Sequence, residues 1–73
     1  MLIKKIVSEL SDTDLAKAFT EIEEWKNTGI LNQSGTFTII HSKFEEKSEE
    51  EQNLRVTESA ILFEIGKRFT ANI

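Results

Sequence analysis

The chain contains no cysteine and no proline, and only three of its 73 residues are glycine. The lack of cysteine excludes disulfide bonds, thiolate catalysis and every zinc site that needs a cysteine ligand. Three scattered glycines cannot form a glycine-rich phosphate-binding loop. Because so short a chain buries a small fraction of its surface and has no disulfide, a second copy or another protein is the expected extra source of stability.

Histidine occurs once, as His41, which limits the chemistry available for catalysis. A nucleophile needs a neighbouring base that a third group orients, and a lone histidine among Thr, Ile and Phe is typical of a packing or surface residue. Acid–base catalysis by paired carboxylates requires an apolar pocket, whereas the most obvious glutamates lie in a very polar run. That run also lacks the alternating ligands and central glycine of a calcium loop. The sequence therefore predicts a non-enzymatic protein without a metal or a cofactor.

Long hydrophobic runs are also missing. The apolar runs of the opening segment MLIKKIVSEL are far too short for a signal sequence or a membrane span. We therefore expect no membrane partner and a cytoplasmic location, which for a phage-encoded protein is the cytoplasm of the host. No repeat, proline or low-complexity linker divides the chain, so residues 1–73 are expected to form one small domain.

Two helices are predicted before residue 29, with a strand as the alternative for the first because it contains Ile and Val. In the first, apolar residues recur at i, i+1, i+4, i+5 and i+8 and cover one face: Leu2, Ile3, Ile6, Val7 and Leu10. In the second, residues 12–28, Ser11 is a good N-cap and Gly29 a good C-terminal cap. The apolar stripe of this second helix comprises Leu15, Ala18, Phe19, Ile22 and Trp25, while Lys17, Thr20, Glu21 and Glu24 face away.

The middle of the chain has the composition of a strand. Residues 32–35 (NQSG) are turn formers, and the β-branched and aromatic run after them predicts a strand over about 36–43. Residues 53–56 would return as the second strand of a loose hairpin. The competing interpretation is helical, because Ser42 with Glu45, and Ser48 with Glu51, have the spacing of a capping box. The sequence leaves both interpretations open.

A third helix is predicted after Thr57, which can serve as its cap. One face carries Ile61, Leu62, Ile65 and Phe69, and Phe63 projects roughly opposite. A helix with apolar groups on two sides is usually sandwiched or lies at an interface, so Phe63, with Lys67, is a candidate for self-association. The predicted fold class is therefore α+β and mainly helical, with two N-terminal helices, a short strand or hairpin region and a C-terminal helix.

The acidic residues are concentrated in one segment. The formal net charge of the chain is −4, and residues 45–51 alone carry five glutamates and one lysine. These glutamates are Glu45, Glu46, Glu49, Glu50 and Glu51. The segment, about 45–53, is either a solvated connection, as most runs of like charge are, or an acidic surface that binds a basic partner. Both interpretations stay open.

Basic residues are too few for an ordinary nucleic-acid-binding face. The helix predicted over residues 12–28 is rich in acids, which phosphates would repel. A helix-turn-helix-like DNA-binding regulator is therefore an alternative that depends on the C-terminal helix, with Arg55, Lys67 and Arg68 as its candidate contacts.

The function that these patterns favour is protein binding. The short chain, its high content of Glu, Lys, Ile and Asn, and its lack of enzyme motifs are typical of small accessory proteins of phages and mobile elements. The sharpest hypothesis is a regulatory protein that inhibits a host nucleic-acid-handling protein by covering a basic site with its acidic segment. A structural or oligomerisation module is a further alternative.

Overall fold

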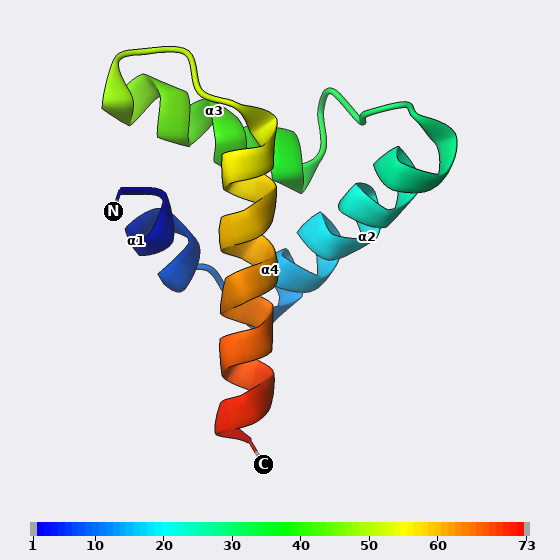
Figure 1. Ribbon diagram of the computed structural model, residues 1–73, viewed down its shortest axis with the longest axis vertical. Helices are drawn as coiled ribbons and strands as arrows, with labels where there is room; N and C mark the ends of the chain where they lie inside the picture. Colours follow the sequence, from blue (N-terminus) through cyan, green and yellow to red (C-terminus); the bar gives the residue numbers. More distant parts are fainter. Residues whose placement is uncertain (1, 73) are drawn as a thin grey trace.

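Four helices make up the part of the chain that the structure, a computed structural model, describes, which is residues 2–72. They are α1 (Leu2–Ser8), α2 (Asp12–Thr28), α3 (Thr36–Ser48) and α4 (Leu54–Ala71). In Figure 1, α4 runs along the long axis of the molecule, α1 and α2 lie to either side of it, and α3 lies across its N-terminal end. Every pair of helices is in contact except α1 and α2.

The predicted α+β class is wrong, because residues 2–72 form an all-α domain without strands. Residues 36–43 lie within α3, and residues 53–56 are the N-cap and first turn of α4. A strand would place Phe37 and Ile39 on one face, but Phe37 is buried while the Ile39 side chain is 51% exposed. The buried positions Phe37, Ile40 and Phe44 follow the period of a helix instead. The burial of this stripe outweighs the preference of β-branched residues for strands.

The predicted helix over residues 12–28 is confirmed with its bounds and both of its caps. The side chain of Ser11 accepts a hydrogen bond from the Asp14 N–H, and Gly29 has the left-handed φ of 76° that ends the helix. The predicted N-terminal helix is also confirmed, as α1, with Ile3, Ile6 and Val7 buried. The second of these helices forms where the sequence supplies both an apolar stripe and a signal at each end.

The N-terminus of α3 is capped by a side chain from another helix. Gly35, the residue before α3, has no side chain to offer, so two backbone N–H groups of the first turn need an outside acceptor. Glu21 of α2 supplies it: its two carboxylate oxygens accept from Thr36 N–H at 2.9 Å and from Phe37 N–H at 3.0 Å. A Cβ on Gly35 would overlap this carboxylate. A larger residue at position 35 would therefore displace the Glu21 carboxylate from the start of α3.

The start of α4 lies three residues before the predicted cap. Asn53 is the N-cap, and its side-chain oxygen accepts from the Arg55 N–H at 2.8 Å. Thr57 lies one turn inside the helix, fully buried, with its Oγ1 2.7 Å from Nδ1 of the buried His41. The hydroxyl that resembled a cap therefore serves as the hydrogen-bond partner of His41, which joins α3 to α4.

One hydrophobic core lies between the four helices. Its buried members come from every helix: Ile3, Ile6, Val7, Leu15, Ala18, Ile22, Phe37, Ile40, Phe44, Ala60 and Ile61. The carboxylate of the largely buried Glu58 on α4 is paired with Lys26 of α2 at 3.0 Å. None of the helices over residues 2–72 is long and apolar enough to cross a membrane.

Candidate interaction surfaces

An uncharged stripe runs along the side of α4 that faces away from the core. We call it the α4 outer face and define it by its six residues, which are all exposed: Ser59, Leu62, Phe63, Gly66, Phe69 and Thr70. The side chains of Phe63 and Phe69 are 61% and 67% exposed, and that of Leu62 is 39% exposed. In a chain with 30% charged residues, a helix face over three turns whose own six residues carry no charge is an unusual surface.

The structure corrects the predicted faces of this helix. The sequence grouped Leu62 and Phe69 with the buried Ile61, whereas the structure places them on the outer face beside Phe63. The reason is geometric, since positions 61 and 62 differ by about 100° around a helix and only one of them can point into a narrow core. The residues that the sequence reasoning missed are therefore Ser59, Leu62, Gly66 and Phe69.

Gly66 lies at the centre of the α4 outer face. A Cβ placed on it would meet no atom within 4 Å outside the local backbone of α4, so the side of Gly66 that a side chain would occupy is open. Its neighbours on the face are large, with Leu62 one turn before it and Phe69 almost one turn after it. The glycine therefore forms a shallow notch between two projecting side chains.

Phe63 and Lys67, the predicted self-association residues, are both exposed on or beside this face. The Nζ of Lys4, on α1, lies 5.1 Å from the centre of the Phe63 ring. This cation–π contact covers one side of the ring and leaves the rest accessible. A role of these two residues in self-association stays a prediction.

A groove lies beside the outer face, where the first turns of α2 approach the last turns of α4. It has a volume of about 330 Å³ and a mostly apolar lining that includes Leu15, Phe19, Ile65 and Phe69. Phe69 belongs both to this groove and to the α4 outer face. The two surfaces are therefore continuous.

The five glutamates of residues 45–51 fall into two groups. Glu45 is half buried in the last turn of α3, where its Oε2 accepts from the Gln52 N–H at 3.0 Å and its Oε1 is 3.7 Å from Nε2 of His41. Glu45 therefore holds the connection between α3 and α4 against the end of α3. Four other glutamates are exposed on and after the end of α3: Glu46, Glu49, Glu50 and Glu51. Glu49 ends α3 with a left-handed φ of 61°.

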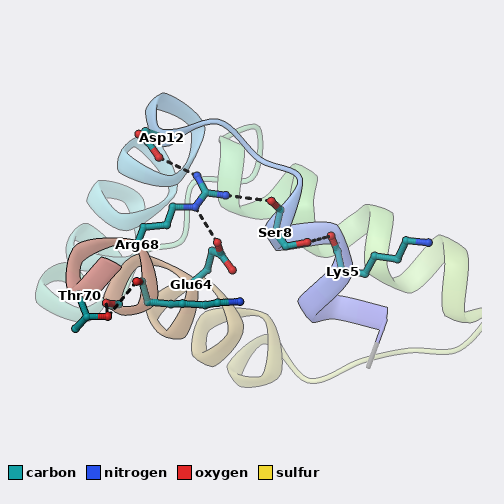
Figure 2. A network of polar contacts seen from close by, with 8 residues as sticks. Lys5, Ser8, Asp12, Glu64, Arg68 and Thr70 are labelled. Atoms are coloured by element: carbon teal, nitrogen blue, oxygen red, sulfur yellow. Dashed lines mark hydrogen bonds and ion pairs between the residues drawn. The ribbon is translucent and has the colours of Figure 1, made fainter. Parts of the chain in front are cut away.

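Arg68 is held by contacts within the chain (Figure 2). Its Nε donates to Glu64 at 2.7 Å, its Nη1 to Asp12 at 2.9 Å, and its Nη2 to the backbone oxygen of Ser8 at 3.2 Å. The hydrogen bonds to Glu64 and Asp12 raise the pKa of the guanidinium, so it stays charged. Of the three candidate nucleic-acid contacts, Arg68 thus fastens α4 to the junction of α1 and α2, while Arg55 and Lys67 are exposed.

Residues 2–72 contain no group of three or more His, Asp or Glu side chains that could hold a metal ion. Comparison of the chain with protein families, curated proteins and solved structures gives no significant match. The candidate site is therefore defined by the surface chemistry of this chain, in which the α4 outer face and the four exposed glutamates are the two prominent features.

Proposed function

We propose that the protein is a non-catalytic, cytoplasmic regulatory protein that acts by binding another protein chain through the α4 outer face. The observation that carries this proposal is the exposure of Leu62, Phe63 and Phe69 on one uncharged helix face. The fully buried centres of protein interfaces are depleted in charged residues and enriched in aromatic ones, which is the composition of this face. Contiguous exposed apolar patches on small proteins commonly mark binding sites.

The arrangement of the chain supports binding along a helix. The face extends over residues 59–70, and its groove with α2 adds the half-exposed Phe19. Meanwhile Arg68, Glu58 and Glu64 on the inner side of α4 are occupied by partners on other helices or on α4 itself. The inner side therefore holds α4 in place, and the outer side stays accessible.

A photocrosslinking amino acid at position 63 tests this proposal in the native host. We expect covalent adducts from the residue at 63, because the face is buried against a partner. The matched control places the same amino acid at Lys17, an exposed position on α2. We expect few adducts there. Equal crosslinking from the two positions, or none from 63, would contradict the proposal. The masses of the adducts also distinguish a second copy from a different protein.

The four exposed glutamates favour a second candidate function. Glu46, Glu49, Glu50 and Glu51 gather at one end of the molecule, around the connection between α3 and α4. Under this proposal the protein, as a phage or mobile-element accessory protein, covers a basic site on a nucleic-acid-handling host protein, and charge complementarity steers the association.

Neutralising matched sets of glutamates tests the second candidate. Replacing Glu49, Glu50 and Glu51 by glutamine is expected to reduce capture of a basic host protein at low salt at least tenfold. The control replaces Glu9, Glu23 and Glu24 by glutamine. These residues are exposed elsewhere on the molecule, so the control removes the same total charge. Glu45 is left intact because it fastens the connection. Equal capture by both variants would exclude this function.

A further inference from the structure

We propose that the α4 outer face pairs with the same face of a second copy, with the two α4 helices antiparallel about a two-fold axis at the level of Glu64. This inference rests on the proposed function, because it names the partner of the same surface. It is carried by the register of large and small residues along the face, by the position of the acidic segment, and by the apolar area exposed.

The spacing of the face is that of a helix-pairing seam. Ser59, Leu62, Gly66 and Phe69 are separated by three, four and three residues, which is the alternation of the a and d positions of a heptad. The a positions hold the small residues, Ser59 and Gly66. The d positions hold the large ones, Leu62 and Phe69. Such a seam presents alternating notches and projections.

The order of notches and projections selects the antiparallel arrangement. When two copies meet antiparallel about the level of residue 64, Leu62 of one copy faces Gly66 of the other, and Phe69 faces Ser59. Every projection then meets a notch, and large and small side chains interdigitate. A parallel pair would set Phe69 against Phe69 and Gly66 against Gly66, which leaves gaps beside crowded layers. The face is therefore complementary to itself in one orientation.

The distribution of charge selects the same arrangement. In each copy, residues 45–51, just before α4, carry a charge of −4, which equals the net charge of the whole chain. Residue 53 lies 11 residues from the two-fold axis, so in the antiparallel pair the two acidic connections are separated by roughly 33 Å along the helices. This distance is about four Debye lengths at physiological salt. A parallel pair would place the two connections side by side, where they repel.

Phe63 lies nearest to the axis of the pair. It is one residue from the level of Glu64, so the two Phe63 rings approach each other across the axis and can form an aromatic pair. With about 200 Å² for each ring, the exposed fractions of Phe63 and Phe69 predict a burial of about 500 Å² from the four rings. Leu62 and the polar rim add to this. The total falls below about 1,200 Å², at which stable interfaces begin, and in the class of weak, transient ones, so we expect an affinity in the micromolar range.

Sedimentation equilibrium of the purified chain from about 5 to about 500 µM tests the pairing across the expected range of affinity. We expect the wild-type mass to rise toward that of a dimer. Phe63→Glu is expected to raise the dissociation constant at least tenfold. The matched control, Ile39→Glu, changes another exposed apolar residue, on α3, and is expected to leave the constant within about twofold. Equal loss in both variants would overturn the proposal.

Gly66→Leu distinguishes an effect on dimerisation from an effect on folding. In the single chain the new Cβ meets no atom within 4 Å, and leucine favours a helix more than glycine does, so we expect the chain to stay folded. In the pair it fills the notch that Leu62 of the other copy occupies. We expect dimerisation to weaken at least tenfold while thermal stability at low concentration is retained. Unchanged dimerisation would overturn the proposed register.

Disulfide crosslinking of single-cysteine variants determines the orientation of the two helices, because the native chain has no cysteine of its own. In the antiparallel register, Ser59→Cys in one copy faces Phe69→Cys in the other, while identical positions are about 15 Å apart along the helix, beyond the roughly 7 Å limit for a disulfide. We expect the mixture to form a crosslinked heterodimer, and neither variant to crosslink alone. Crosslinking of each variant with itself would overturn the antiparallel arrangement.

A wild-type chain that stays monomeric at about 500 µM would exclude self-pairing, whereas adducts of a different protein from position 63 would still support the proposed function.

Discussion

Phe37→Ala is expected to lower the free energy of unfolding by about 3–5 kcal/mol, the range found for removing a buried aromatic ring. Phe37 is fully buried in α3, and the centre of its ring is 5.8 Å from that of Trp25 on α2. Truncation opens a cavity between these helices that a chain of 73 residues has few side chains to refill. Since small domains are only marginally stable, such a loss removes most of the folding free energy.

Urea unfolding followed by the fluorescence of Trp25, the only tryptophan, measures this effect. The control is Phe63→Ala at a protein concentration of about 5 µM. It removes the same ring from an exposed position, and its expected effect is about 0.5 kcal/mol or less. If Phe37→Ala changed the free energy of unfolding by no more than Phe63→Ala, the assignment of Phe37 to the core would be wrong.

Glu21→Ala is expected to cost about 2 kcal/mol of stability. The carboxylate of Glu21 is the acceptor for two N–H groups at the start of α3, and hydrogen bonds to a charged group are stronger than neutral ones. The negative charge also lies at the positive end of the α3 dipole. Glu21→Gln keeps an acceptor but loses the charge, so its expected loss is about half as large.

Two further variants connect this loss to the cap. Glu24→Ala removes a glutamate from the exposed side of the same helix and is expected to change stability by about 0.5 kcal/mol or less. Gly35→Ala forces the Glu21 carboxylate away from α3, so its effect and that of Glu21→Ala should not add in the double variant. Additive effects in urea unfolding would show that Glu21 and Gly35 act separately and would contradict the cap.

The helix over residues 12–28 could be predicted from the sequence because its signals are local. Ser11 and Gly29 mark its ends, and its apolar stripe has a regular period. The predicted turn at residues 32–35 also agrees with the structure, in which the Gly35 N–H donates to the backbone oxygen of Asn32. By contrast, α3 begins after a glycine, and the group that caps it lies 15 residues earlier. A local pattern holds no signal for a cap on a different helix.

The surfaces were only partly predictable for a related reason. The helical period predicts that Phe63 projects opposite Ile61, but Leu62 and Phe69 lie on the border between the two faces of α4. The spacing of Ser59, Leu62, Gly66 and Phe69 was nevertheless readable in the sequence. In the same way, Arg68 could be placed near the end of a helix, whereas its bond to Asp12, 56 residues away, required the fold.

The measurement that tests the central claim most directly is a dilution series of amide NMR spectra between about 500 and about 20 µM. If the α4 outer face is the binding surface of this protein and pairs with itself, the amides of residues 59–70 shift together with concentration. Those of the acidic connection, residues 49–53, stay unchanged. Spectra without any dependence on concentration, or shifts confined to the acidic connection, would contradict this account.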